Sequence, residues 1–152
     1  MEANAHLLTD LAIDLFQHKI RPVYRVGDVE KRLPAGRGGV KDIRSIAGRN
    51  NLGQAILMRL LTPMGELAGL GHPDYGSRLT SLVGQVNTDT TRNLARLYIL
   101  ESLKKEPRVE KVTLIKVSEV FKQPSMISIE LEVKPIDSTD IITIGPFTLN
   151  LA

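Results

Sequence analysis

Cysteine and tryptophan are absent from this 152-residue chain, and aromatic residues make up only 4% of it. Without cysteine, the chain forms neither disulfides nor thiolate zinc sites, and nothing points to an oxidising compartment. So few aromatic residues supply a poor platform for stacking bases or sugars. No apolar run approaches the roughly 20 residues of a membrane span, and acids stand in the N-terminal stretch MEANAHLLTD where a signal peptide would be basic. We therefore expect a cytosolic protein.

The charge of the chain is mildly basic. A formal net charge of +3 is compatible with nucleic acid but does not require it. The cations of the Gly-rich segment 31–49 could bind phosphates or dock on an acidic protein surface; they are Lys31, Arg32, Arg37, Lys41, Arg44 and Arg49. Nucleic acid is the less favoured partner, because the segment has no aromatic residue to stack a base and Asp28, Glu30 and Asp42 dilute its charge. We expect no membrane partner.

Groups for catalysis are scattered along the sequence. His6, His18 and His72 form no metal-binding motif, and the Gly-rich run 36–42 lacks the spacing of a phosphate loop. A glycosidase needs two carboxylates facing each other across a cleft, and four residues qualify by type only: Glu66, Asp74, Glu101 and Glu106. The cations around Glu106 lower a carboxyl pKa, whereas a general acid needs a raised one. We predict no catalytic residue, no metal and no cofactor.

Several helices are predicted in the first two thirds of the chain. Residues 6–16 fit both a helical stripe and a strand alternation, and we favour the helix. Segment 21–49 is typical of a loop. A helix capped by Asn50 or Asn51 should run to about Leu61, where Thr62 and Pro63 stop it. A short helix is expected over residues 75–83, and a longer one, capped at residues 88–89, should end near Lys105, since Pro107 follows.

The longer helix is apolar almost all round. Leu94, Leu97 and Tyr98 fall on one side of it, while Ile99 and Leu103 fall on others. Two arrangements account for this pattern. The helix is central, between a sheet and other helices, or a second protein covers one of its sides.

The last third of the chain has the pattern of an antiparallel sheet. Apolar residues alternate cleanly over 127–133, whereas the phase slips over 112–117, which indicates a bulge or burial on both faces. Residues 122–125 suit a hairpin loop, and a third strand, in one or two pieces, spans 141–151. The sequence thus predicts an α+β fold with an N-terminal helical part and a central helix packed on a C-terminal antiparallel sheet of about three strands. We divide the chain into an arm with a basic loop, 1–49, and a domain, 50–152.

A charged corner joins the long helix to the sheet at Glu106-Pro107-Arg108. Proline holds this corner in a fixed geometry, which places the two charges at low entropic cost. The pair serves an interface with a partner, or an internal salt bridge that fixes the corner. The two roles are compatible.

Three stretches in this order carry a resemblance to a known family: NLGQAILMRLLTPMGEL, GHPDYGSRL and the EPR tripeptide. Over residues 50–151 the chain resembles the small baseplate-wedge subunits of contractile injection machines, which occur in myophage tails, type VI secretion baseplates and extracellular contractile injection particles and are sometimes labelled lysozyme-like. The resemblance implies a non-enzymatic subunit, in several copies around a six-fold assembly, whose sheet templates sheath growth by strand addition. It implies the sheath subunit, two larger wedge proteins and hub or tube proteins as partners. The protein would be in the cytoplasm during assembly and in the baseplate afterwards.

The resemblance also implies which residues meet partners. The corner residues Glu106, Pro107 and Arg108 are joined by Tyr75 and Arg78, and Phe147 and Leu149 belong to the strand expected to pair with the sheath. An N-terminal helix would bundle with the two larger wedge proteins through Leu7, Leu11 and Leu15, an inference that fails if residues 6–16 form a strand. Two other functions stay open, a peptidoglycan hydrolase and a soluble regulatory adaptor that shares the fold.

Overall fold

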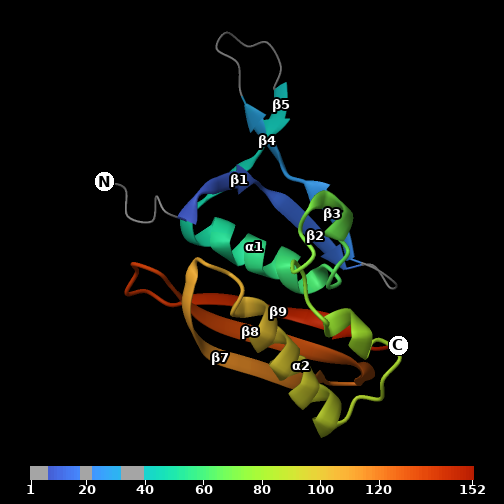
Figure 1. The fold of residues 1–152 in the computed structure, drawn as a ribbon. Helices are drawn as coiled ribbons and strands as arrows, with labels where there is room; N and C mark the ends of the chain where they lie inside the picture. Colours follow the sequence, from blue (N-terminus) through green and yellow to red (C-terminus); the bar gives the residue numbers. More distant parts are fainter. Residues whose placement is uncertain (1–6, 18–21, 32–39) are drawn as a thin grey trace. The chain divides into compact units, whose positions relative to one another are not determined.

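The computed structural model describes residues 7–17, 22–31 and 40–152 (Figure 1). The chain divides into two compact units, an N-terminal unit Met1–Gln54 and a C-terminal unit Ala55–Ala152. The division falls inside helix α1, Gly48–Leu61. In the part of the chain that the structure describes, no helix combines the length and apolar character that crossing a bilayer requires.

The N-terminal unit is built from three short antiparallel ladders. Strand β1 (Thr9–Leu11) pairs with β6 (Ser45–Ala47), β2 (Ile13–Gln17) with β3 (Pro22–Val26), and β4 (Asp28–Lys31) with β5 (Val40–Ile43). The ladders meet where the Ala12 N–H donates to the Arg44 carbonyl, Gly27 to Ala12, and Arg44 to Gly27, at 2.7, 2.7 and 2.8 Å. We call this ring of three main-chain hydrogen bonds the junction.

The helix predicted over residues 6–16 is therefore wrong, because this segment forms β1 and β2. Leu11 lies in β1 and is 47% exposed, whereas Ile13 begins β2, so the alternation of these residues does not run along one strand. The side chain of Gln54 bridges the step between the two strands by accepting from the Ile13 N–H and donating to the Leu11 carbonyl, both at 2.8 Å.

The loop predicted over residues 21–49 is also wrong, since β3 to β6 lie in it. Strand β3 pairs with the preceding β2, β4 with β5, and only β6 with a distant strand, β1, so main-chain pairing holds a segment of low apolar content. Residues 36–39 of the Gly-rich run 36–42 lie outside the described residues.

Helix α1 begins earlier than predicted and ends as predicted. Asn51 lies inside the first turns instead of capping them, and its amide donates to the Leu7 carbonyl (3.0 Å). The helix ends at Leu61, and the Thr62 hydroxyl donates back to the Met58 carbonyl (2.8 Å). Thr62 and Pro63 thus stop the helix.

Helix α2, Asp89–Leu103, matches the predicted long helix and its cap. The Thr88 hydroxyl accepts from the Thr91 N–H (3.2 Å), which satisfies a donor of the first turn. One side of the helix is buried through Thr91, Ala95, Ile99, Ser102 and Leu103. Leu97, on the other side, is 53% exposed. The cover of that side by a second protein stays a prediction.

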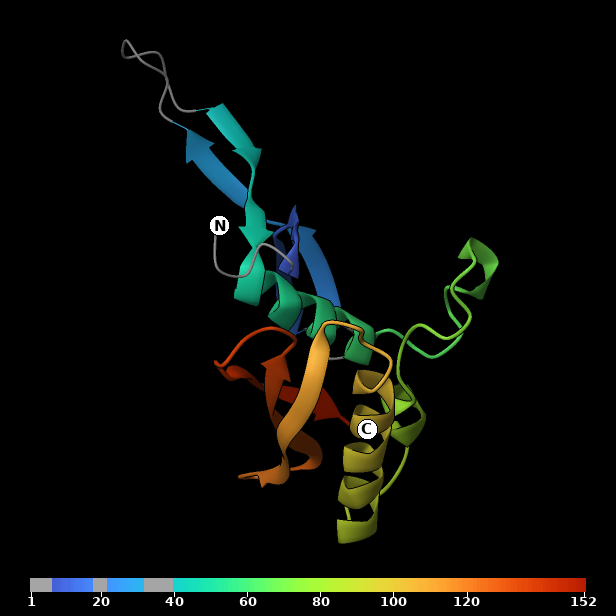
Figure 2. The same cartoon turned by 60° about the vertical axis from the view of Figure 1, so that its left-hand side comes forward.

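The C-terminal sheet has three antiparallel strands in the order β7 (Val109–Val120), β8 (Gln123–Pro135) and β9 (Ile142–Asn150). Helix α2 packs along β7, as both views show (Figure 1; Figure 2). The odd-numbered residues of β8 from Ile127 to Val133 are fully buried, while the even-numbered ones form the outer, polar face. The α+β fold with a three-stranded C-terminal sheet is confirmed.

The predicted phase slip in the first strand is confirmed as a bulge. The register shifts between Val112, which pairs with Val133, and Leu114, which pairs with Glu132. Val112 thereby joins Ile115 on the core face, and Leu114 lies on the outer face.

The connection from β7 to β8 is shorter than predicted. Val120 pairs with Gln123, so Phe121 and Lys122 alone make the turn, with Lys122 at φ 60°. Residues 123–125 belong to β8 and not to a loop. Pro124 is tolerated there because it lies at the start of the strand.

The third strand is one piece, with an irregularity at Gly145-Pro146. Gly145 has φ +99°, and a Cβ there would lie 2.7 Å from the Ile129 carbonyl oxygen, so only glycine fits. The register shift at this point puts both Ile144 and Phe147 on the core face, opposite Leu131 and Ile129.

The helix predicted over 75–83 is wrong. Residues 75–77 run beside residues 62–65, with Ser77 N–H donating to the Thr62 carbonyl (2.8 Å) and Met64 N–H to the Ser77 carbonyl (2.9 Å). This pairing uses the backbone groups that a helix would need. Within the predicted range only the 3₁₀ helix η3, Leu79–Leu82, is helical; another 3₁₀ helix, η2 at Ala68–Leu70, precedes the range.

Candidate functional site

The charged corner is an internal ion cluster. Glu106 is only 5% exposed. Arg108 Nε donates to its Oε1 at 2.7 Å, and Arg59 Nη2, from the last turn of α1, donates to its Oε2 at 3.4 Å. One buried carboxylate thus ties the end of α1 to the start of the sheet.

The two arginines hold Glu106 in its charged form. Burial raises the pKa of the Glu106 carboxyl, but the hydrogen bond from Arg108 and the charges of Arg108 and Arg59 together outweigh burial, so the pKa lies below its usual value. A general acid at neutral pH needs the opposite shift. The cluster is suited to holding structure and charge, not to donating a proton.

Tyr75 lies against the same cluster. The Arg59 guanidinium is stacked over the Tyr75 ring, 4.5 Å from its centroid, in a cation–π geometry. Burial raises the pKa of the Tyr75 hydroxyl, against the opposing charge of Arg59. Tyr75 therefore stays neutral and serves as a flat support for Arg59.

The segment that carries Tyr75 is clamped by its neighbour Gly76. Gly76 has φ +109°, and a Cβ there would lie 2.7 Å from the Thr62 and Pro63 carbonyl oxygens. From α2, the Ser102 hydroxyl donates to the Gly76 carbonyl (2.9 Å). The position of Tyr75 is thus set by main-chain contacts from both sides.

Arg78 belongs to a second cluster on the surface. Its Nη2 and Nε donate to Glu101 Oε2 at 2.6 and 3.2 Å, and its guanidinium lies over the Tyr98 ring, 4.4 Å from the centroid. Tyr98 and Glu101 both come from α2. Arg78 and Tyr75, predicted together, therefore make separate Arg–Tyr contacts.

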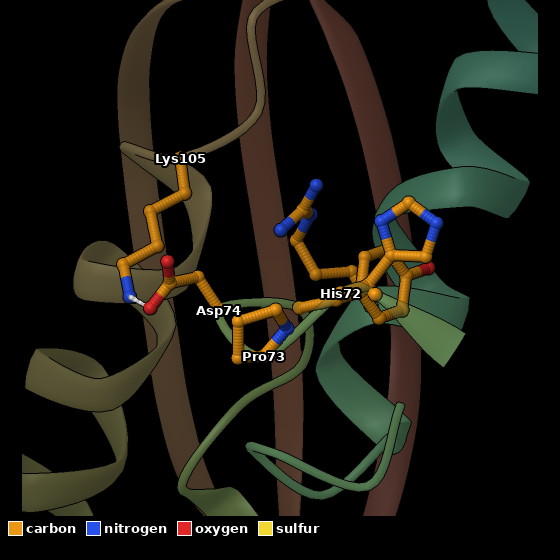
Figure 3. Close-up of a pocket in the computed structure, with 7 residues that line it drawn as sticks. His72, Pro73, Asp74 and Lys105 are labelled. Atoms are coloured by element: carbon orange, nitrogen blue, oxygen red, sulfur yellow. Dashed lines mark ion pairs between the residues drawn. The ribbon is translucent and has the colours of Figure 1, made fainter. Parts of the chain in front are cut away.

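An open depression of about 520 Å³ lies beside Tyr75. Arg59 and Tyr75 form part of its lining with Lys105, and residues 71–74 supply the rest (Figure 3). Lys105 Nζ and Asp74 Oδ1 are 4.0 Å apart, a loose pair across the depression. Both side chains are solvent-accessible, so this pair contributes little to stability.

Arg59 is the residue that sequence reasoning did not select. The signal was available, since a cation stands between apolar residues in ILMRLL. An arginine in such a run is either solvated or bound to a buried carboxylate, and the sequence does not show which.

The other predicted interface residues have different surroundings. Leu7 and Phe147 are buried, Leu149 is half-buried, and Leu11 and Pro107 are exposed. The side chain of Leu15 lies outside what the structure describes. Contacts of these residues with partners stay a prediction.

Within residues 7–17, 22–31 and 40–152, the structure brings together no group of three or more His, Asp or Glu side chains able to hold a metal ion. Three of the four acidic candidates pair with cations, namely Glu106 with two arginines, Glu101 with Arg78, and Asp74 with Lys105.

Comparison with known proteins gives an informative likeness to a solved structure. No family model matches the chain, and no curated protein matches it either. Among solved structures, the chain is similar to the crystal structure of a "putative tail lysozyme" from Geobacter sulfurreducens, with a TM-score of 0.58 and 20% sequence identity. The match covers 68% of this chain and 90% of that one. At this identity the likeness establishes that the two proteins share a fold.

Proposed function

We propose that the chain is a structural, non-enzymatic subunit of a contractile tail or injection system that joins the baseplate wedge and templates sheath assembly by strand addition. Two arguments support the proposal. The ordered motifs of residues 50–151 resemble the wedge family, and the fold is shared with a protein named a "putative tail lysozyme".

The observation that carries the proposal is the sheet with two outer strands. Among the described residues, β7 and β9 each pair with a strand on one side only. An outer strand of this length presents main-chain N–H and C=O groups to an extended segment of another protein.

Strand β9 is the better edge for this role. Strand β7 is interrupted by register shifts, and Arg96 of α2 already donates to the Val117 carbonyl in its middle (2.9 Å). In β9, residues 147–150 keep a regular register with β8. Phe147 is anchored in the core, so the backbone of this stretch is held in place. The proposed sheath contact is therefore the β9 edge over residues 147–150, the stretch that contains Phe147 and Leu149.

The proposed partners are the sheath subunit, two larger wedge proteins, and hub or tube proteins around a six-fold assembly. The route to the larger wedge proteins through an N-terminal helix is abandoned, because residues 9–17 are strands. The exposed side of α2, with Leu94 and Leu97, is an apolar surface suited to such a contact.

The test removes one main-chain donor from the β9 edge. The Leu151 N–H donates to the Ser125 carbonyl of β8, so the neighbouring Asn150 N–H points away from β8. Asn150→Pro deletes that donor, and Asn150→Ala keeps it while losing the same side chain. Purified baseplates that carry Asn150→Pro should fail to start a sheath, and those with Asn150→Ala should start one. Sheaths of normal number and length on Asn150→Pro baseplates would refute strand addition at this edge.

A peptidoglycan hydrolase is the rival function, suggested by the word lysozyme in the name of the matched structure. We expect purified protein to release no soluble fragments from peptidoglycan. Release that is lost on Glu66→Gln or Asp74→Asn would establish the hydrolase instead. A regulatory adaptor is the third possibility, and it would capture a regulator from cells without any sheath subunit.

A further inference from the structure

Arg59 has a buried hydrogen-bond donor, Nε, without an acceptor among the described residues. The residue is 9% exposed, and its Nη2 reaches Glu106 only at 3.4 Å. A buried donor without an acceptor lowers the stability of the fold. The Nε of Arg59 therefore indicates that an acceptor is missing beside the cluster of Arg59, Glu106 and Arg108.

The same arginine lines the open depression. Its guanidinium is fixed from two sides, by the Tyr75 ring and by Glu106. A guanidinium held in this way is preorganised for a planar anion, because its donors already point in set directions.

We propose that this depression binds the carboxylate of an acidic side chain from a partner protein. The inference rests on the proposed function only for the identity of that partner. Arg59 supplies the fixed donors, and Lys105 at the rim supplies a second, mobile cation. A carboxylate matches an arginine in shape and charge, and charge-assisted bonds of this kind are among the stronger hydrogen bonds in proteins.

The charge balance favours a carboxylate over a phosphate. Around the depression and the cluster behind it, the cations Arg59, Lys105 and Arg108 face the carboxylates Asp74 and Glu106. The balance is one positive charge, which a monoanion neutralises. A phosphate dianion would exceed it and would lie near Asp74.

The shape of the depression favours a protein segment over a free metabolite. Residues 71–74 at its rim are exposed, so a small ligand would keep much of its surface in water, unlike ligands in enclosed pockets. Next to this rim, Leu70 is 76% exposed. A peptide that placed an acidic side chain in the depression would have Leu70 available as an apolar contact beside it.

The experiment follows the Nε–Hε NMR signal of Arg59 in the full-length chain, labelled with ¹⁵N. Four probes are titrated at constant ionic strength: acetate, inorganic phosphate, and acetylated, amidated Ala-Glu-Ala and Ala-Gln-Ala peptides. We expect a saturable shift with acetate and with the Glu peptide, and none with the Gln peptide. The proposal is overturned if neither carboxylate gives saturation, if the Gln peptide binds as well as the Glu peptide, or if phosphate binds more tightly than both carboxylates.

Rim variants sharpen this test without touching the buried cluster. Lys105→Gln should weaken binding of the Glu peptide, and Asp74→Asn should strengthen it, each by about twofold to fivefold, the range of exposed charge interactions. Lys104→Gln is the matched control, since Lys104 is an exposed neighbour that does not line the depression, and it should leave binding unchanged. Equal affinities for all three variants would overturn the proposal. These titrations contain no sheath protein, so their failure is distinguishable from failure of the strand-addition test.

Discussion

Replacing Glu106 by glutamine should destabilise the C-terminal unit although the side chain keeps its size. The change removes the only anion that pairs with buried Arg59 among the described residues. Removing one partner of a buried ion pair costs about 3 to 5 kcal/mol. Two features reduce this figure. The glutamine oxygen still accepts one hydrogen bond, and Arg59 keeps its contact with the Tyr75 ring. We expect a loss of about 2 to 3 kcal/mol in the free energy of unfolding.

The assay is urea and thermal unfolding of Glu106→Gln, followed by circular dichroism. For a chain of this length the expected loss lowers Tm by about 5 to 10 °C. Glu101→Gln is the matched control, because Glu101 makes the same kind of bond, to Arg78 at 2.6 Å, but its side chain is 41% exposed. The control should lose less than about 1 kcal/mol. If the two variants unfold at the same urea concentration, the burial of Glu106 has no energetic consequence and the reasoning is refuted.

Three further predictions concern the same unit. The stability advantage of the wild type over Glu106→Gln should be full above the ordinary carboxyl pKa of 4.5 and should shrink as the pH falls below it, because the pKa of folded Glu106 is lowered; urea melts between pH 7 and pH 3 measure this, and an advantage that grows in acid would contradict it. Gly145→Ala should lower the free energy of unfolding by about 2 to 4 kcal/mol, because the new Cβ meets the Ile129 carbonyl at 2.7 Å. Gly84→Ala, with φ +88° but no atom within 4 Å, should lower it by about 1 kcal/mol in the same melts. Equal losses would show that backbone strain alone matters. Thr88→Ala should cost about 1 kcal/mol through loss of the α2 cap, and exposed Thr90→Ala is its control; indistinguishable melts would mean that the cap is dispensable.

The parts of the fold that the sequence predicts well are those with strong local patterns. Strand β8 alternates without a break, and α2 has both a capping threonine and a proline after its end. Even the bulge in β7 is predictable, because one extra residue in a strand shifts the phase of its apolar alternation. Such features depend on residues close together in the chain.

The N-terminal ladders could not be predicted in the same way. Their strands are three to five residues long, and β1 pairs with β6, about 36 residues further along the chain. Pairing of this kind is carried by main-chain groups, which every sequence possesses, so side chains give little sign of it. The helix expected over 75–83 failed for a related reason, since Gly76 serves a close approach to residues 62–63.

The candidate site was half predictable. Glu106 and Arg108 stand out because a proline separates them, and their mutual contact spans two residues. The contact of Arg59 with Glu106 joins residues that are 47 positions apart in the sequence, and no pattern in the residues around either one predicts it. A buried charge needs a counter-charge, but the sequence alone offers many candidates for that role.

The junction in the N-terminal unit has a consequence for how this region can vary. Its three hydrogen bonds join Ala12, Gly27 and Arg44 through backbone atoms, and position 27 carries the main demand on side chains, because a Cβ there would lie 2.7 Å from Arg44 Nη2. Each of the three ladders begins next to the junction, and the junction sets which residues of the ladder lie opposite each other. A change in the length of one ladder at its far end would therefore leave the register of the other two ladders unchanged.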